Sequence, residues 1–285
     1  MPKWFERSIK HYYWWLPCSL YSVDANAWGL VTHLYFAHSL LWAMPLLDPR
    51  LQKAIKRFPE LVMAGACLPD LAIVSHRFSD THLWENAHRL LLNAKTDPEI
   101  AIAIGYASHL YVDVIAHHHF VPAHEAMWFE NKITTHIACE WAMDSHLTSL
   151  VDTSPKRLLK QHQSQIIKFI APHFNCTHGN MTQALNRLAY WDGILRLVKL
   201  PSVIYRVARF LDKRVDKNFA YYIAKTQMAI GDIGTMLNGF NPVFEPEQKA
   251  LDFGQLNTWR HRCVNHLKLQ HPLPIQYFEV YTEEL

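Results

Sequence analysis

Apolar residues recur every three or four positions along most of this chain, which is the period of one face of an α-helix. No long stretch alternates apolar and polar residues as a half-buried strand would. Leu68-Pro69-Asp70 breaks the periodicity and places Asp70 at a helix end or in a loop. The pattern predicts an all-α protein with helices over residues 30–47, 50–66 (broken near Pro59), 80–94, 98–119, 130–151, 155–171, 181–199, 202–238 (with breaks) and 246–268.

Composition agrees with a helical protein that has a sizeable core. Half of the 285 residues are hydrophobic and only nine are glycine, which disfavours turn-rich β architectures. The net charge of +3 argues against a nucleic-acid partner, whose binding surface would be more basic and more clustered. The five cysteines form no C-x-x-C motif, so we expect neither a disulfide framework nor a thiolate zinc site. No stretch approaches the roughly 20 apolar residues of a transmembrane helix.

Histidines and carboxylates recur inside these apolar segments at helical spacing. His109 and Asp113 are four residues apart, as are His136 and Glu140, and residues four apart share one face of a helix. Two helices therefore each direct an imidazole and a carboxylate into one space, and these ligand types suit zinc. Metal ions would offset the cost of carboxylates in the core. The candidate ligands are His33, Asp70, His82, His109, Asp113, His117 or His119, His136 and Glu140.

The triplet His117-His118-His119 leaves a choice of ligand open. An ideal helix places His117 and His119 about equally far around the helix from His109, on opposite sides of it, so spacing does not decide between them. Other histidines are expected at the surface or behind the ligands: His118, His124 and His146.

The candidates lie in motifs that resemble those of the zinc-dependent phospholipase C family. This family includes bacterial secreted phospholipases C and the N-terminal domain of glycosylphosphatidylinositol-specific phospholipase D, and fungal zinc nucleases share its helical core. The resemblance covers about residues 28–150 and implies an all-α, multi-helix bundle with two or three zinc ions. It is carried by Trp28-Gly29-Leu30-Val31-Thr32-His33, Ala64-Gly65-Ala66-Cys67-Leu68-Pro69-Asp70, Ser79-Asp80-Thr81-His82, Ser108-His109, Asp113 with the histidine triplet, and His136 with Glu140.

The resemblance also implies how the ligands are shared between the metals. The first zinc would be held by Asp70, His82, His109 and Asp113. The second would be held by His136, Glu140 and one histidine of the triplet, which is His119 in the pattern of the secreted enzymes and His117 in that of the phospholipase D-like branch. The third would be held by His33 with the shared Asp113, and by the amino group of Trp28 if that residue became the N-terminus.

This ligand set implies metal-assisted hydrolysis of a phosphodiester, most simply a phospholipid. Zinc ions can clamp a phosphate and activate water for attack on phosphorus. Asp70 is expected to orient or deprotonate that water in addition to, or instead of, ligating metal. Two alternatives stay open: a nuclease or small-phosphodiester hydrolase on the same core, and a zinc-binding structural protein without catalysis. The sequence does not distinguish a phospholipase C outcome from a phospholipase D outcome.

The chain divides into a leader (1–27), a metal-binding core (28–153) and a helical continuation of the same domain (154–285). The leader combines basic residues, an aromatic run over 12–23 and Ala25-Asn26-Ala27, which are the three parts of a secretory signal. Cleavage after Ala27 would make the protein periplasmic or secreted. An uncleaved leader would leave it cytoplasmic or associated with a membrane.

Two features outside the candidate ligands also bear on function. Asp144 is four residues after Glu140 and therefore lies on the same helix face. It either hydrogen-bonds a ligand or is a solvated carboxylate. Residues 195–217 form a basic amphipathic segment, which either touches an anionic membrane peripherally or is a core helix with a solvated face.

Overall fold

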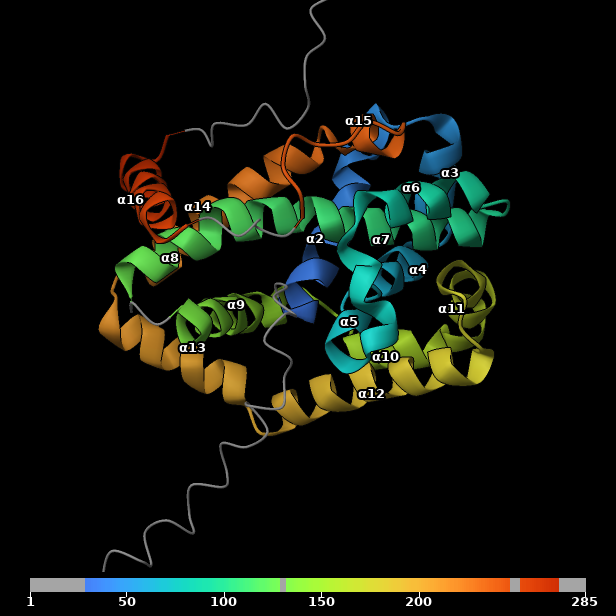
Figure 1. Cartoon of the computed structure of the whole chain (residues 1–285), viewed down its shortest axis with the longest axis horizontal. Helices are drawn as coiled ribbons and strands as arrows, with labels where there is room; N and C mark the ends of the chain where they lie inside the picture. The colour runs from blue at the N-terminus through green and yellow to red at the C-terminus, as the bar shows by residue number, and fades with distance from the viewer. Residues whose placement is uncertain (1–28, 129–131, 247–251, 272–285) are drawn as a thin grey trace, which may run out of the picture.

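The computed structural model describes residues 29–128, 132–246 and 252–271, and within these ranges the regular elements are helices (Figure 1). The predicted all-α class is confirmed. The α-helices of the first half are α2 (Leu30–Ala43), α3 (Pro49–Arg57), α4 (Pro59–Gly65), α5 (Leu71–Val74), α6 (Trp84–Asn93), α7 (Asp97–Ile115), α8 (Val121–Met127) and α9 (Lys132–Leu147). Those of the second half are α10 (Pro155–Gln161), α11 (Gln163–Ile170), α12 (His178–Leu197), α13 (Leu200–Leu211), α14 (Val215–Ile230), α15 (Ile233–Leu237) and α16 (Phe253–Leu269).

Local signals account for most helix boundaries, but several predicted ranges need correction. The range 155–171 is divided between α10 and α11, and the helix predicted over 246–268 begins as α16 at Phe253. Pro59 begins α4 and separates it from α3, as the sequence predicts. Thr96 and Glu99 form a capping box that starts α7. The helix predicted over 80–94 instead begins at Trp84, because 3₁₀ turns (η3, His76–His82) precede it. The helix predicted over 98–119 passes through a π turn (η4, Ala116–Phe120) into α8.

Helix α7 runs through the middle of the molecule (Figure 1). Every residue from Ile100 to Ile115 is buried. Together with its continuation to Met127, it is long and apolar enough to qualify as a membrane span by composition, contrary to our reading of the sequence. Its apolar window lies entirely inside the protein, however, which is the situation of a core helix.

Glycines at the crossing of α4 and α7 let the two backbones touch. A Cβ atom on Gly105 would collide with the carbonyl oxygen of Val62, and one on Gly65 would collide with that of Ile102. This close approach places the end of α4, and the turn that leads to Asp70, directly against the face of α7 that carries the candidate ligands.

The second half of the chain packs around the first. Helix α13 contacts α9, α14 contacts α2 and α7, and α16 contacts α8. Helix α12 lies along one edge of the molecule, against α10 (Figure 1). The buried apolar side chains form one core cluster that extends from Leu30 to Leu267. The helices after residue 154 therefore continue the packing of the first half. The leader (1–27) and Trp28 lie outside the described residues.

Candidate metal centre

Three groups of imidazoles and carboxylates meet beside the middle of α7. Within each group, one candidate ligand atom per residue lies within 4.8 Å of the others. The groups are His33, His109 and Asp113; Asp70, His82 and His109; and His117, His136 and Glu140. All of these residues are buried except His136, whose side chain is 13% exposed. The structure thus brings together all candidates from the sequence except His119.

Asp113 joins the groups, because its two carboxylate oxygens face different histidines. Oδ2 lies 3.0 Å from Nε2 of His109 and 3.5 Å from Nε2 of His82. Oδ1 lies 3.3 Å from Nε2 of His33 and 4.0 Å from Nε2 of His117. A carboxylate in this arrangement has the geometry to bridge two cations.

Asp70 and His82 come from two segments that are tied to each other. Asp70 precedes α5, and its Oδ1 atom lies 3.8 Å from Nε2 of His109. Next to His82, the hydroxyl of Thr81 donates a hydrogen bond to the carbonyl of Pro69 at 2.6 Å. The hydroxyl of Tyr106 on α7 donates to the carbonyl of Thr81. These bonds hold both segments against α7, which fixes where their side chains point.

The hydrogen bond of His109 determines which ring nitrogen faces the groups. Its Nδ1 atom lies 2.8 Å from the carbonyl oxygen of Ala66 at the end of α4. A carbonyl only accepts, so Nδ1 carries the proton and Nε2 is left with a lone pair for a cation. The ring also stacks on that of His33, with centroids 3.6 Å apart.

The histidine triplet falls in the π turn between α7 and α8. A π turn advances by less rotation per residue than an α turn. His117 therefore falls back toward the face that carries Asp113 and enters the third group, where its ring lies 5.3 Å from that of His136. The same smaller rotation per residue carries His119 further from the face of Asp113. The π turn thus distinguishes the two histidines that an ideal helix leaves equivalent.

The other triplet members point to a different part of the core. The ring of His119 packs against Phe244 and Trp259, with centroids 6.1 and 5.9 Å away. The Nε2 atom of His118 lies 2.9 Å from the carbonyl oxygen of Glu245. Neither histidine belongs to the three groups. Of the other two histidines set aside from the sequence, His124 is fully buried rather than at the surface, and His146 is only partly buried.

Asp144 supports the centre from behind. It is not a solvated carboxylate, and its side-chain hydrogen bonds within the described residues go to Val31, Thr32 and Arg196 rather than to a candidate ligand. It is 3% exposed and accepts hydrogen bonds of 2.8 Å from both the backbone N–H and the hydroxyl of Thr32, next to His33. Its other oxygen pairs with Arg196 of α12 at 3.1 Å. A Cβ atom on Gly29 would collide with this carboxylate, so glycine is required there for the contact. Asp144 thereby joins the start of α2 to α9, the helix of Glu140.

A second support was not foreseen from the sequence. Glu125 of α8 lies with Oε1 4.0 Å from Nδ1 of His136. Arg260 of α16 donates two hydrogen bonds to the other oxygen of Glu125, at 2.8 and 2.6 Å. A carboxylate behind a histidine orients its ring toward a metal. No local pattern could have revealed this pair, because its members are 135 residues apart.

Apart from Nε2 of His82 and His109, which lie 3.3 Å from each other, most of the ligand atoms that face one another have no hydrogen-bond partner within the described residues. These buried atoms include Nε2 of His33, His117 and His136, Oδ1 of Asp70, both oxygens of Asp113 and Oε1 of Glu140. The Nε2 atom of His136 is only 2.9 Å from Oε1 of Glu140, yet the pair lacks the alignment of a hydrogen bond. Buried polar atoms without partners are costly, and cations between them would satisfy them. The donor set therefore fits zinc.

The charge balance of the metal-free site points the same way. Burial raises the pKa of Asp70 to about 8 and that of Glu140 to about 7. Burial opposes ionisation of Asp113 as well, but the adjacent His109 and His33 hold its pKa well below its usual range. Without metal, Asp70 therefore stays mostly protonated at neutral pH and Glu140 is only partly ionised. Metal ions would supply positive charge and release the protons.

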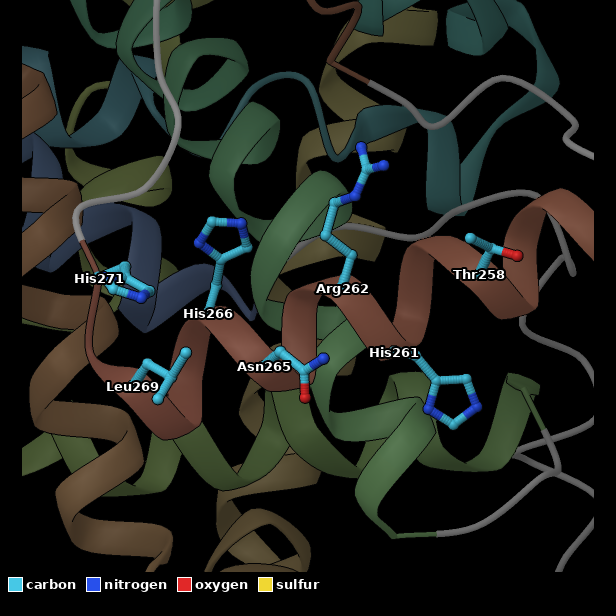
Figure 2. A pocket seen from close by; sticks show the side chains of 7 residues that line it. All are labelled: Thr258, His261, Arg262, Asn265, His266, Leu269 and His271. Carbon is cyan, nitrogen blue, oxygen red and sulfur yellow. The ribbon is translucent and has the colours of Figure 1, made fainter.

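A hollow on the surface of α16 lies apart from these groups (Figure 2). Its lining shares no residue with them: Thr258, His261, Arg262, Asn265, His266, Leu269 and His271. Figure 2 shows these side chains spread along α16, with His271 on the segment that follows it, rather than converging on one point, which does not suggest a catalytic site.

Comparison with known proteins gives one finding for this chain. The model of a family described as zinc dependent phospholipase C matches residues 32–190. The match includes every member of the three groups. Searches of curated proteins and of solved structures gave no match.

Proposed function

Because this chain belongs to the zinc-dependent phospholipase C family, we propose that it is a zinc-dependent phosphodiesterase that hydrolyses phospholipids. The observation that carries the proposal is the convergence of buried, unpartnered imidazole and carboxylate atoms around Asp113. The family supports hydrolase chemistry in general, and the lipid substrate is our inference from it.

We assign the ligands from the three groups. His82 and His109, with Asp70 and one oxygen of Asp113, would hold the first zinc. The second would be held by His117, His136 and Glu140, and His33 with the other oxygen of Asp113 would serve a third. Zinc ions in these positions would polarise a phosphate and lower the pKa of water.

The residues of the chain would position the reactants and handle the proton. Asp70 has a buried oxygen without a hydrogen-bond partner at the edge of the first group, which suits it to accept the proton of the attacking water. The water oxygen bonds to phosphorus as one ester P–O bond breaks, and the leaving oxygen takes up a proton. Asp113, held between four histidines, keeps the groups at a fixed spacing.

The test pairs zinc content with turnover of a water-soluble chromogenic phosphodiester, p-nitrophenylphosphorylcholine. We expect at least two zinc ions per chain by elemental analysis. Asp70→Asn should lose at least about 100-fold in turnover while it keeps most of its zinc, since a general base contributes about 10²–10⁴-fold. Asp80→Asn, an exposed carboxylate in the neighbouring η3, is the matched control and should keep full turnover.

The alternatives predict other results. Zinc-loaded protein without turnover of any phosphodiester would identify a structural zinc protein. Cleavage of single-stranded DNA in preference to phospholipid would identify a nuclease. Full turnover by Asp70→Asn would exclude its role as the base, and a folded, active protein with less than one zinc per chain would refute the proposal as a whole.

A further inference from the structure

Helix α13 divides its apolar residues between the core and solvent. Ala208 is buried, and Ile204 and Tyr205 pack against the core. On the other side, Val203, Val207 and Phe210 are 42, 51 and 76% exposed. In a helix of 3.6 residues per turn these three positions fall within an arc of about 60°. A core helix with a solvated polar face would not show this stripe.

The stripe continues into the turn that precedes the helix. Leu197 and Val198, at the end of α12, are 81 and 58% exposed, and Leu211 at the other end of α13 is 63% exposed. Six of the large, strongly exposed apolar side chains of the described residues therefore lie within positions 197–211. Clustered exposure of this kind marks a binding surface, whereas single exposed apolar residues do not.

Positive charge surrounds this stripe. Residues 196–217 contain seven cationic and two acidic side chains, in a chain whose net charge is only +3. Lys199, Arg206 and Lys213 are exposed, and none of them has an ion-pair partner within the described residues. Lys213 lies over the ring of Phe210, 5.5 Å from its centroid. A partner that fits this surface is apolar and carries negative charge.

We propose that α13 and the preceding turn form the surface by which the protein docks on an anionic phospholipid membrane, with the apolar stripe among the acyl chains and the cations among the head groups. A lipid surface matches both properties of the stripe at once. The inference rests on the proposed lipid substrate. It also has a geometric consequence, because α13 packs directly on α9, which carries His136 and Glu140 (Figure 1). Docking would place the membrane one helix layer from the metal centre.

The chain offers a matched pair of variants for the test. Leu197 and Leu92 are both leucines near the end of a helix, 81 and 86% exposed, but Leu92 lies on α6, outside the stripe. Likewise, Arg206 and Arg187 are both exposed, but Arg187 lies on α12 outside residues 196–217. Zinc-loaded, full-length protein would be sedimented with vesicles of phosphatidylcholine alone or mixed with phosphatidylserine.

We expect the wild-type protein to sediment with the anionic vesicles and much less with the neutral ones. Leu197→Ser should reduce binding several-fold and Leu92→Ser should not. Arg206→Gln should weaken binding about five-fold, the equivalent of the roughly 1 kcal/mol that each cation near an anionic surface contributes, and Arg187→Gln should leave it unchanged. All four variants should turn over the water-soluble phosphodiester at the wild-type rate, because none of them touches the metal centre.

Turnover of the soluble substrate separates failure of this inference from failure of the proposed function. Active protein that does not bind anionic vesicles, or that binds them equally well with Leu197→Ser and Leu92→Ser, would overturn the docking surface and leave the phosphodiesterase intact. If vesicle binding is absent and Leu197→Ser instead abolishes a dimer seen by sedimentation velocity, the stripe is a contact between two copies of the chain.

Discussion

The carboxylate of Asp144 on α9 accepts hydrogen bonds from the first turn of α2, and the variant Asp144→Ala tests whether these bonds hold that turn in place. The carboxylate accepts from the N–H and the hydroxyl of Thr32 at 2.8 Å and from the N–H of Val31 at 3.4 Å, and it pairs with Arg196 at 3.1 Å. Its side chain is 5% exposed, so solvent screens these interactions little. Removal leaves Arg196 with Asp192 alone and leaves the first turn of α2 without its negative partner.

The size of the effect follows from these contacts. Loss of one partner from a buried ion pair costs about 3–5 kcal/mol, and the remaining pair with Asp192 places Asp144→Ala at the lower end of that range. At about 2–4 °C per kcal/mol for a domain of this size, the midpoint of thermal unfolding should fall by about 6–12 °C. Asp144→Asn keeps an oxygen acceptor for Thr32 and should lose about half as much.

Differential scanning calorimetry of the zinc-loaded protein provides the measurement. Glu60→Ala is the control, because that carboxylate also bonds two side chains but is 39% exposed, so its loss should cost no more than about 1 kcal/mol. Zinc content gives a second readout, since His33 follows Thr32 and the third site should empty first. A fall of less than about 2 °C for Asp144→Ala, no larger than that of Glu60→Ala, would show that the contact does not hold α2.

Three further outcomes are expected. His117→Ala should lose about one zinc per chain, whereas His119→Ala should keep all of its zinc and lose only core packing; equal zinc loss by both would contradict the role of the π turn. Removal of zinc by a chelator should lower the midpoint of unfolding by several degrees and zinc should restore it, because the metal stabilises the native state by about 4 kcal/mol at 1,000 times its dissociation constant; an unchanged midpoint would exclude metal from the centre. N-terminal sequencing of the protein from its host should find Trp28 as the first residue if residues 1–27 are an export signal, and a chain that starts at Met1 in the cytoplasmic fraction would reject export.

The family and the helical class were accessible from the sequence because both depend on local spacing. The period of apolar residues predicts where α2, α7 and α9 lie, and prolines mark the starts of other helices such as α3, α4 and α10. The four-residue spacings of His109 with Asp113 and of His136 with Glu140 place each pair on one helix face without knowledge of the fold. These features are set by bonds and rotations within a few residues, so a linear sequence contains them.

The tertiary structure decided what depends on neighbours distant in the chain. The placement of His117, and not His119, beside His136 and Glu140 follows from a π turn that spacing alone does not predict. The supports behind the centre join residues such as Glu125 and Arg260, which meet only because α16 packs on α8. The exposed stripe of α13 is of the same kind, because the sequence marks its residues as apolar but only packing on α9 determines which of them are covered. Local periodicity specifies which residues share a helix face, and only the arrangement of helices specifies what that face meets.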